Sequence, residues 1–490
     1  MTPSVAIIGA GFGGLCMAIR LRRAGIGSFT VFEKAADLGG TWRDNSYPGA
    51  GCDIPSHLYS YSYSFEKYAS WTRRYPAQPE ILAYLEHCAD KYDVRRKIRF
   101  GAEVRRAVFD GRRWQVTSVH DGGERTEAFD VVVMSVGQLN RPHLPEIPGM
   151  SDFEGVSFHS ARWNHDHDLT GRRVAVIGSG SSAAQLIPAV AERAAHLDVF
   201  QRTPNWVIPK PDATFGPLTR LAFHYVPGLQ RVYRELIYRY GEATLYPALA
   251  EGWSAGLLKK RALAHLRAQV PDPVLRAKLT PGYPPGCKRV VIDSAFYPAL
   301  TRPDVEVVTD PIVRIGPKGV ETAEGLREAD TIVYATGFLS TEFLAPMEVT
   351  GLGGRSLAEQ WRDGAQAYLG ISVPGFPNMF LLYGPNTNLG HNSIIYMIEC
   401  QVRHVMACLA RVAEQGPIEV RPAAMAAWTR QLDAAMARMV WGEGCRSWYK
   451  TSEGRVTNNW PGPTTLYRRL TARPPDGAYR RIEEVPSSVR

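Results

Sequence analysis

The chain contains 490 residues, of which 45% are hydrophobic and 21% are charged. These proportions are ordinary for a globular protein, and the length predicts roughly three domains with ample chain for a large core. The formal net charge is +9, but lysine and arginine are spread along the chain, and dense runs such as 95–99 and 467–470 are short. This pattern predicts solvated basic faces and a preference for anionic small ligands, and it argues against a nucleic-acid-binding protein.

The cysteines and the apolar runs bear on the cellular compartment. Cysteines stand at positions 16, 52, 88, 287, 400, 408 and 445, and no two of them have the CxxC spacing. This arrangement predicts neither a disulfide framework nor a zinc site, and it favours reduced thiols in a cytoplasm. The first apolar run starts at residue 5, which leaves no room for a signal peptide, and no uninterrupted apolar run reaches about 18 residues. We therefore expect a cytoplasmic protein without a transmembrane helix.

Residues 5–33 have the pattern of a strand, a glycine-rich turn, a helix and a second strand that ends in an acid. The apolar run VAII leads into GAGFGG, which places Gly9, Gly11 and Gly14 in the GxGxxG spacing. Gly9 would permit a tight turn, Gly11 the approach of a pyrophosphate, and Gly14 close packing of helix on strand. The helix N-terminus offers N–H groups to phosphates. Glu33, about 20 residues further on, can accept a hydrogen bond from a ribose hydroxyl. This context predicts a dinucleotide site rather than an unliganded turn.

The sequence between this unit and residue 150 predicts a functional loop, a helix and a small β-layer. The loop at 38–53 is rich in glycine and proline and carries aromatic residues and an acid. The alternation of Tyr59, Tyr61, Tyr63 and Phe65 with polar residues predicts a strand with one aromatic face. An amphipathic helix is expected from residue 78, and several short strands are expected over 98–134, the last of them returning to the first sheet beside the cofactor.

The opening pattern returns at residue 173, where VAVIGSG…VFQR repeats VAIIGAG…VFEK. Gly178 and Gly180 match the first two glycines of the first unit, and Ala183 takes the third, packing position. The chain is therefore expected to contain two dinucleotide-binding units.

The two units differ at the residue expected to meet the ribose. The first unit has Glu33, whereas the second has Gln201 followed by Arg202. An acid favours a free ribose 2′-hydroxyl, and arginine beside a neutral residue favours a 2′-phosphate. This contrast assigns the ADP part of FAD to the first unit and NADPH to the second, and it predicts a flavoprotein that NADPH reduces.

The second half of the chain begins with residues 211–286, whose helical patterns are rich in tyrosine, leucine and arginine. We expect a helical insert packed beside the nucleotide unit, and the alternative is a surface that contacts lipid or admits a lipophilic substrate. A basic pair, Lys288–Arg289, directly precedes a predicted strand in the segment GCKRVVID from residue 286. The segment DTIVYATGF from residue 330 predicts a strand of the second sheet. A strand, a Gly/Asn/Pro loop and a long helix follow from residue 376, with the loop expected near the flavin. The proline-rich tail from residue 460 is expected to be irregular.

Two motifs carry a resemblance to a known family. The connector at 138–172 contains FEGVSFHSARWN, which matches the fingerprint F-x-G-x-x-x-H-T-x-x-W-P/D except at Ser160 and Asn164. The matching positions are Phe153, Gly155, His159 and Trp163. The early loop matches G-G-x-W, Y-P-G and then D at Gly39, Gly40, Trp42, Tyr47, Pro48, Gly49 and Asp53. Over nearly its whole length the chain resembles the type I Baeyer–Villiger monooxygenases and the related flavin-containing monooxygenases, which are class B flavoprotein monooxygenases.

The resemblance implies an α/β fold with two Rossmann-like dinucleotide-binding domains and a helical insert. Its implied FAD-binding domain comprises 1–150 and 372–490, the latter including the C-terminal tail. The NADPH-binding domain comprises 173–210 and 287–371, the linker with the fingerprint spans 151–172, and the helical insert spans 211–286.

The resemblance also implies the reaction and the residue roles. FAD and NADPH would insert one oxygen atom of O₂ beside a ketone carbonyl, through a flavin peroxide, to give an ester or lactone. Asp53 and Arg289 would form the catalytic pair, because a fixed guanidinium is always charged and can stabilise an anionic oxidant. His159 would be a hinge or linker residue that responds to cofactor binding. The implied cofactor-binding residues are Gly9, Gly11, Gly14, Glu33, Gly40, Thr41, Trp42, Asp53, Tyr59, Gly178, Gly180, Ser181, Ser182, Arg202, Thr203 and Lys288, with Arg202, Thr203 and Lys288 on the 2′-phosphate.

Other functions stay open on the sequence alone. The same cofactors would serve oxygenation of amines or sulfides, in which a protonated peroxide acts as the electrophile, and Trp163 favours the Baeyer–Villiger branch over these. A thiol–disulfide flavoprotein reductase would need a nearby cysteine pair, and a non-catalytic NADPH sensor would not need Asp53 or the pair Lys288–Arg289. His165 and His167 lie in a polar segment and are expected to be solvated, so no metal is expected. The expected substrate is a small, lipophilic ketone used with O₂, in a pocket shaped by 211–286, 386–392 and 441–460; its identity, the regiochemistry and the oligomeric state are not determined by the sequence.

Overall fold

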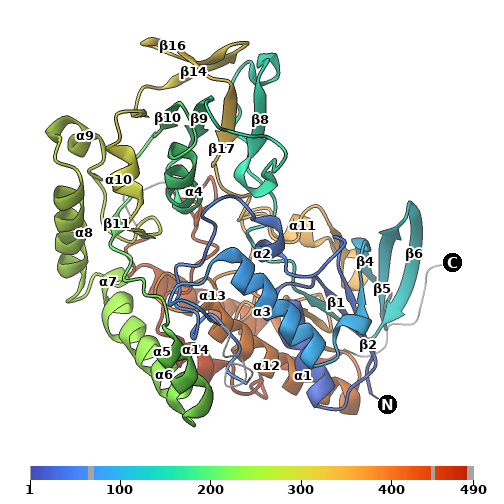
Figure 1. Ribbon diagram of the computed structural model, residues 1–490. Helices are drawn as coiled ribbons and strands as arrows, with labels where there is room; N and C mark the ends of the chain where they lie inside the picture. The colour runs from blue at the N-terminus through green and yellow to red at the C-terminus, as the bar shows by residue number, and fades with distance from the viewer. Residues whose placement is uncertain (1, 64–70, 443–446, 483–490) are drawn as a thin grey trace.

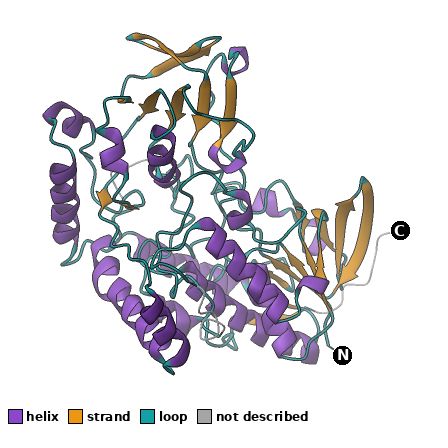
Figure 2. Cartoon of the chain, in the orientation of Figure 1, coloured by secondary structure: helices purple, strands orange, loops and turns teal. Residues whose placement is uncertain are grey.

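The computed structural model describes residues 2–63, 71–442 and 447–482. Two five-stranded parallel sheets form its framework, and the helical insert runs along one side of the molecule (Figures 1 and 2). The predicted α/β fold with two dinucleotide-binding units and a helical insert is confirmed.

The first sheet has the strand order β19-β7-β1-β2-β3, and all of its strands run parallel. The central strands β1 and β7 are buried along their whole length, as apolar strands covered on both faces must be. Helix α1 packs with α3 and α12 in the core on one face of this sheet. The strands are β1 (Val5–Ile8), β2 (Phe29–Phe32), β3 (Ile98–Arg99), β7 (Val131–Met134) and β19 (Met379–Leu381), and the helices are α1 (Phe12–Arg23), α3 (Gln78–Lys91) and α12 (Ile394–Gln415).

The second sheet has the order β13-β10-β9-β17-β8, again all parallel. Helices α4 and α10 cover one face, with a core made from apolar side chains of β9, β10 and these helices. The strands are β8 (Val156–His159), β9 (Arg173–Ile177), β10 (His196–Phe200), β13 (Val305–Val308) and β17 (Thr331–Tyr334), and the helices are α4 (Ser181–Ala191) and α10 (Phe296–Leu300).

The repeat seen in the sequence extends to the whole architecture of both units. Each sheet carries an antiparallel three-stranded excursion, which lies between β3 and β7 in the first sheet and between β13 and β17 in the second. This excursion packs on the other face of the sheet. In the first unit the excursion is β4 (Glu103–Phe109), β5 (Trp114–His120) and β6 (Gly123–Phe129), and β18 (Glu348–Thr350) adds to its edge. In the second unit it is β14 (Ile312–Gly316), β15 (Gly319–Thr322) and β16 (Gly325–Glu328).

The fifth strands come from distant parts of the chain. β19 follows the second unit, and β8 precedes it, within the segment predicted as a linker. β18 belongs to the segment predicted to complete the NADPH-binding domain, yet it pairs with β4 of the first unit. The domain limits given above stay a prediction.

The remaining elements include the helical insert and the C-terminal segment. The insert contains α5 (Pro217–Tyr225), α6 (Leu229–Tyr240), the π-helix η5 (Gly241–Leu245), α7 (Tyr246–Leu249), α8 (Ala255–Gln269) and α9 (Pro273–Lys278), between β11 (Val207–Ile208) and β12 (Val291–Ile292). The others are α2 (Thr41–Asp44), α11 (Leu357–Gln360), β20 (Ile418–Val420), α13 (Pro422–Met436), α14 (Thr464–Leu470), β21 (Tyr479–Arg481) and the 3₁₀ turns η2 (Arg95–Lys97), η3 (Met150–Asp152), η4 (Ser160–Arg162) and η6 (Leu352–Gly354).

Two local predictions are wrong. Residues 59–63 form bends and turns rather than a strand, because their N–H groups bind side chains: the amide of Tyr61 donates to Tyr84 Oη and that of Ser62 to Glu399. Phe65 lies outside the described residues. The tail is not irregular, since α14 begins directly after Pro463, which suits the position before a helix because proline lacks an N–H.

The cysteine prediction also needs correction. Cys287 is disulfide-bonded, so the expectation of seven reduced thiols is wrong at this position. Cysteines 16, 52, 88, 400 and 408 are free and buried. Within the described residues, no helix combines the length and the apolar character needed to cross a lipid bilayer.

Candidate active site

A cavity of about 1970 Å³ opens where the carboxyl ends of both parallel sheets meet. Ligands of open α/β sheets bind at this edge, because the turns after the strands expose backbone N–H groups there. Nearly all predicted cofactor-binding and catalytic residues line the cavity: Gly9, Gly11, Glu33, Gly40, Thr41, Trp42, Asp53, Tyr59, Gly178, Gly180, Ser181, Ser182, Arg202, Thr203, Lys288 and Arg289. Gly14 and the four fingerprint residues lie off its wall.

The first glycine turn has no room for side chains. Gly9 has a φ of 102°, and a Cβ there would lie 2.5 Å from Ser135 O. A Cβ at Gly14 would lie 1.8 Å from Gly9 O, so α1 approaches β1 as closely as only glycine permits. Gly11 and Gly40 face each other across the cavity wall, and a Cβ at Gly40 would lie 3.2 Å from Gly11 Cα. This bare backbone at the start of α1 fits a pyrophosphate.

Replacing Gly14 with alanine is expected to displace α1 and to lower the free energy of unfolding by about 3 kcal/mol, because the new methyl group meets backbone that cannot move freely. The variant is also expected to retain less FAD, measured as flavin absorbance per protein. Gly27→Ala is the matched control, since a Cβ there meets nothing within 4 Å. Equal stability and flavin content of both variants would contradict this role of Gly14.

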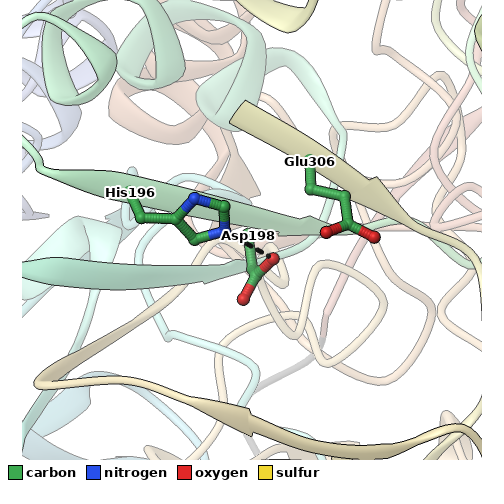
Figure 3. A group of neighbouring side chains, drawn as sticks. All are labelled: His196, Asp198 and Glu306. Atoms are coloured by element: carbon green, nitrogen blue, oxygen red, sulfur yellow. Dashed lines mark hydrogen bonds and ion pairs between the residues drawn. The ribbon is translucent and has the colours of Figure 1, made fainter. Parts of the chain in front are cut away.

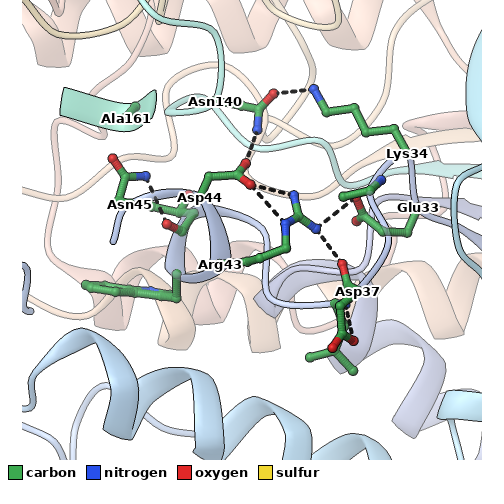
Figure 4. A network of polar contacts seen from close by, with 12 residues as sticks. Glu33, Lys34, Asp37, Arg43, Asp44, Asn45, Asn140 and Ala161 are labelled. Carbon is green, nitrogen blue, oxygen red and sulfur yellow. Dashed lines mark hydrogen bonds and ion pairs between the residues drawn. The ribbon is translucent and has the colours of Figure 1, made fainter. Parts of the chain in front are cut away.

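Glu33 is buried and held by three donors (Figure 4). Its Oε2 accepts from the amide of Ala10 at 2.9 Å, and its Oε1 accepts from the amide of Ala35 at 3.0 Å and from Arg43 Nη1 at 3.1 Å. A carboxylate has about four lone-pair sites, so Glu33 can still accept a hydrogen bond from a ribose hydroxyl. Arg43 also binds Asp44, which in turn accepts from Asn140 at 3.0 Å. This network fixes the carboxylate, and no sequence pattern marks Arg43 as part of the site.

The short helix α2 supplies the opposite wall of the flavin side. Trp42 Nε1 donates to Tyr59 Oη at 3.0 Å, and Thr41 Oγ1 donates to Leu139 O at 3.4 Å. Burial raises the pKa of Tyr59 well above its usual value, so its hydroxyl stays protonated. These side chains enclose an aromatic, largely apolar wall of the kind that suits a flat ring system.

The second turn repeats the first, with one difference at the ribose position. Gly178 has a φ of 122°, a Cβ there would lie 2.4 Å from Ala335 O, and α4 begins at Ser181 next to the cavity. Gln201 is buried, and its side-chain amide donates to Lys278 O at 2.9 Å, so that donor is already engaged. The neighbouring Arg202 is exposed on the cavity wall.

Arg202, Thr203 and Lys288 form a cationic corner of the cavity. Lys288 Nζ donates to Thr203 Oγ1 at 2.8 Å. Partial burial and the positive charge of Arg202 both lower the pKa of Lys288. Two positive charges held close together repel each other, and a bound anion relieves this repulsion. The corner is therefore preorganised for a phosphate.

Asp53 and Arg289, which are 236 residues apart, form a bidentate ion pair on the cavity wall. Arg289 Nε donates to Asp53 Oδ2 at 3.0 Å, and Arg289 Nη2 donates to Asp53 Oδ1 at 2.8 Å. The side chain of Arg289 is 25% exposed and that of Asp53 is 18% exposed, so both reach the cavity. The charge of Asp53 raises the pKa of Arg289 against the opposing effect of burial. The guanidinium is therefore permanently charged and fixed in orientation.

Comparison with known proteins places this geometry in a family. A family model described as flavin-binding monooxygenase-like matches residues 2–221. A Baeyer–Villiger monooxygenase of Streptomyces coelicolor is 42% identical, over 99% of this chain and 94% of its own length. The chain belongs to the Baeyer–Villiger monooxygenases. It is thus a flavoprotein monooxygenase that uses FAD and NADPH to oxygenate a small molecule with O₂.

Solved structures agree with this assignment of the monooxygenase. The complex of OTEMO with FAD and NADP superimposes with a TM-score of 0.85 at 29% identity, covering 96% of this chain and 97% of that one. An oxidised steroid monooxygenase bound to NADP superimposes with a TM-score of 0.84 at 34% identity and the same coverage. The predicted Baeyer–Villiger class and the two cofactors are confirmed, and oxygenation of amines or sulfides is not favoured.

Arg289 of the monooxygenase is supported from the C-terminal side of the chain. Its Nη1 donates to Leu389 O at 3.2 Å, in the loop predicted to approach the flavin. The C-terminal segment anchors this loop, because the amide of Asn388 donates to Asn458 O and the amide of Trp460 donates to Asn388 O. The tail therefore positions a hydrogen-bond acceptor of Arg289.

Helix α6 and the π-helix that follows it reach the loops on both sides of the ion pair. Arg234 is buried, and its Nη1 donates to His57 O at 2.7 Å and to Ser60 O at 2.8 Å, in the loop after Asp53. Glu242 lies 3.2 Å from His391 Nε2 and accepts from Asn392 Nδ2 at 2.9 Å. Sequence patterns did not reveal these residues, because a charged residue on an amphipathic helix normally faces water.

Glu242→Ala is expected to lower the free energy of unfolding by about 3 kcal/mol, because it leaves the buried donors of Asn392 and Thr464 without this acceptor and removes the carboxylate beside His391. Burial raises the pKa of Glu242, but the hydrogen bonds from His391 and Thr464 outweigh burial and hold the pKa below its usual value. The stabilising charge is thus present at neutral pH and lost as the pH falls through this lowered pKa. Urea unfolding at neutral and acidic pH measures both effects.

Glu235→Ala on the same helix is the matched control for Glu242→Ala. Glu235 is exposed and pairs with Arg239 four residues on, so its removal is expected to change stability by about 0.5 kcal/mol or less. Equal losses in the two variants would contradict the role assigned to the Glu242 contacts.

The fingerprint residues of the monooxygenase build the edge of the second sheet rather than the cavity wall. A Cβ at Gly155 would lie 2.5 Å from Asp330 O, so glycine lets β8 lie against β17. The rings of Phe158 and Trp163 pack edge to face at 5.1 Å. Burial lowers the pKa of His159 to about 4, which keeps its ring neutral at physiological pH. His159 Nδ1 accepts from the amide of Ala161 at 3.1 Å.

Two groups of side chains resemble metal sites. His165 Nε2 lies 2.7 Å from Ser46 Oγ, and His167 Nε2 lies 2.8 Å from Thr331 Oγ1, so each ring has a hydroxyl partner. His196, Asp198 and Glu306 bring their ligand atoms within 4.8 Å of one another (Figure 3). Arg327 forms an ion pair with Glu306 at 2.6 Å and lies 3.9 Å from Asp198. A guanidinium already balances these acids, so the group is an ion-pair network of the sheet rather than evidence for a metal.

Proposed function

We propose that the chain converts a lipophilic ketone to an ester or lactone at the pair Asp53–Arg289. The observation that supports this proposal is the bidentate contact of these side chains on the wall shared by the two nucleotide turns. A permanently charged, oriented donor at this place suits a reaction in which negative charge develops on oxygen.

The residue sets on the two sides of the cavity suit different cofactors. On the flavin side, the backbone at Gly9, Gly11 and Gly40 would hold the pyrophosphate and Glu33 the ribose, with Thr41, Trp42 and Tyr59 along the wall. On the nicotinamide side, Gly178, Gly180, Ser181 and Ser182 would hold the pyrophosphate, and Arg202, Thr203 and Lys288 the 2′-phosphate. When both are bound, FAD and NADPH supply the redox chemistry and the activation of O₂.

Arg289 would perform two tasks in this reaction. Its guanidinium stabilises negative charge as it develops on the attacking oxygen and on the ketone oxygen. Asp53 orients the guanidinium through two hydrogen bonds and partly offsets its charge, so that Nη1 and Nη2 keep fixed directions. Asp53 is accordingly a positioning residue for Arg289 as well as part of the flavin pocket.

His159 is proposed as a structural hinge and not as a base. It ends β8, where the connector from the first sheet enters the second, and its ring lies 5.9 Å from that of Phe338 on the cavity rim. Because its pKa is about 4, protonation does not contribute near neutral pH. A shift of β8 on cofactor binding would move this contact.

The substrate is proposed to be lipophilic because apolar side chains meet near the ion pair. Ile54, Leu389, Ile394, Ile395 and Trp448 line the cavity together with Arg289. Such walls favour a ketone whose carbonyl faces the guanidinium and whose carbon skeleton lies against the apolar side chains. The cytoplasmic location expected from the sequence stays a prediction.

The test is a panel of linear, cyclic and aryl ketones assayed for NADPH oxidation together with ester formation. The proposal expects ester and consumed NADPH in nearly equal amounts for at least one lipophilic ketone. A thioether included in the same mixture serves as the control for an electrophilic oxidant. NADPH oxidation with only peroxide released, or sulfoxide as the sole product, would contradict the proposal.

A further inference from the structure

Exposed apolar side chains are concentrated in the helical insert. Among the described residues, 16 large apolar side chains are exposed, and 10 of them lie between positions 218 and 274. Single exposed apolar residues are normal on proteins, whereas a concentration of them marks an interaction surface.

These side chains form two stripes on neighbouring helices. On α5, Leu218, Leu221 and Tyr225 recur with helical spacing and are 82%, 54% and 70% exposed. On α6, Val232, Leu236 and Tyr240 recur every four residues and are also exposed. The two helices contact each other and lie side by side at the lower left of the molecule, away from both sheets (Figure 1).

The helices of the insert carry apolar side chains on both sides: Phe223 and Tyr233 pack inward on His57, whereas the stripes are exposed. The residues that α6 buries are Gln230 and Arg234, whereas α5 has no fully buried residue. A helix of a water-exposed domain turns its apolar stripe to the core and its charges to solvent. Here the apolar stripes face outward, so the core of this chain does not account for them.

Basic side chains outnumber acidic ones among the exposed residues of this part of the insert. The exposed cations between positions 217 and 261 are Arg220, Arg231, Arg239, Lys259, Lys260 and Arg261, and the exposed acids are Glu235 and Glu251. Trp253 and Leu257, at the start of α8, add exposed apolar side chains next to the lysines. Exposed aromatic and aliphatic side chains together with an excess of cations are the composition of a helix that lies in the interface of an anionic bilayer.

We propose that the outer surface of α5 and α6, called the hairpin face below, docks on an anionic lipid surface. The inference rests on the proposed use of a lipophilic ketone, which partitions into lipid. A second copy of the chain fits less well, because an isologous contact would bring the same cations together. Helix α6, with 12 residues, is too short to span a bilayer, so the hairpin face lies in the interface.

The position of the hairpin face links docking to the active site. The inner side of α6 carries Arg234, and the π-helix after it carries Glu242, which hold the loops on both sides of Asp53 and Arg289. Lipid contact at the outer side therefore takes place on the element that borders the cavity loops. A ketone dissolved in the lipid would be released next to these loops.

The experiment is co-sedimentation of the FAD-loaded protein with vesicles of phosphatidylcholine alone or mixed with phosphatidylglycerol. The proposal expects binding to the mixed vesicles and loss of binding at high salt, because headgroup attraction is screened. The triple variant Leu218→Ser, Val232→Ser, Leu236→Ser is expected to reduce the bound fraction about tenfold or more, since three apolar side chains no longer bury in lipid. The matched control is Leu144→Ser, Val313→Ser, Leu326→Ser, which removes exposed apolar side chains elsewhere and is expected to bind normally.

The outcomes separate this proposal from the others. No binding to mixed vesicles, equal binding to neutral vesicles, or equal loss in both triple variants would overturn it. If the protein is a dimer without lipid and the triple variant of the hairpin face is a monomer, the face binds a second copy of the chain instead. Vesicle binding is measured without turnover, so a chain that binds lipid but forms no ester would refute the proposed function and leave the docking intact.

Discussion

Arg289→Ala is expected to form ester at least 100- to 1000-fold more slowly than the parent protein, about the loss seen when one preorganised donor to a developing oxyanion is removed. Reduction of the enzyme by NADPH should continue, because the side chains proposed to hold the nicotinamide cofactor, including the neighbouring Lys288, are all retained. The measurement combines stopped-flow reduction of the flavin with quantification of ester. The variant is expected to consume NADPH and release peroxide instead.

A stability measurement and the variant Arg289→Lys are the controls for Arg289→Ala. The variant leaves the partly buried Asp53 without its partner, so its stability must be measured separately. Arg289→Lys keeps a positive charge but cannot form the bidentate contact, and it is expected to retain an intermediate rate. Full ester yield from Arg289→Ala would remove this residue from the catalytic role.

Arg202→Ala and Lys288→Ala are expected to raise the KM for NADPH about tenfold each and roughly 100-fold together, since each removes a charged contact to the 2′-phosphate. The lower end of the usual range applies because Arg202 is exposed to solvent. The KM for NADH should change little, so the preference for NADPH is the quantity to follow. Lys318→Ala, at an exposed turn between β14 and β15, is the matched control and should leave both values unchanged.

The same corner predicts a dependence on pH. Binding of the phosphate needs protonated Lys288, and burial together with Arg202 lowers the pKa of this lysine. The KM for NADPH should therefore rise with pH through a midpoint below that of an ordinary lysine, near 10.4. In Arg202→Ala the midpoint should move upward, because one of the charges that lower the pKa is gone. If Arg202→Ala and Lys288→Ala keep the preference for NADPH over NADH, and Arg202→Ala keeps the pH midpoint, the 2′-phosphate does not bind at this corner.

Local patterns in the sequence predicted much of the fold. The apolar runs before Gly9 and Gly178 are β1 and β9, and the helical patterns of 211–286 are α5 to α9, because short-range periodicity decides these elements. The fifth strands β8 and β19 were harder to assign to their sheets, since their pairing joins distant segments. The aromatic alternation at 59–63 was misleading because the side chains of Tyr84 and Glu399, rather than a neighbouring strand, bind that backbone.

The candidate site shows the same division. The contrast between Glu33 and Arg202 predicted the two cofactors from the residues themselves, although the amide of Gln201 points to Lys278 O instead of the cavity. The contact of Asp53 with Arg289 followed only from the resemblance, because no local pattern joins residues so far apart. Arg43, Arg234 and Glu242 were not predicted, since each works through a partner that only the folded chain brings near.

The central claim is that the chain inserts oxygen from O₂ beside a ketone carbonyl. The most direct test is turnover of an accepted ketone under isotopically labelled O₂, with mass spectrometry of the product and a parallel reaction of Arg289→Ala. We expect an ester or lactone that carries one labelled oxygen, formed in proportion to the NADPH consumed and nearly absent with the variant. A product without label, or labelled sulfoxides and amine oxides with no ester from any ketone, would contradict it.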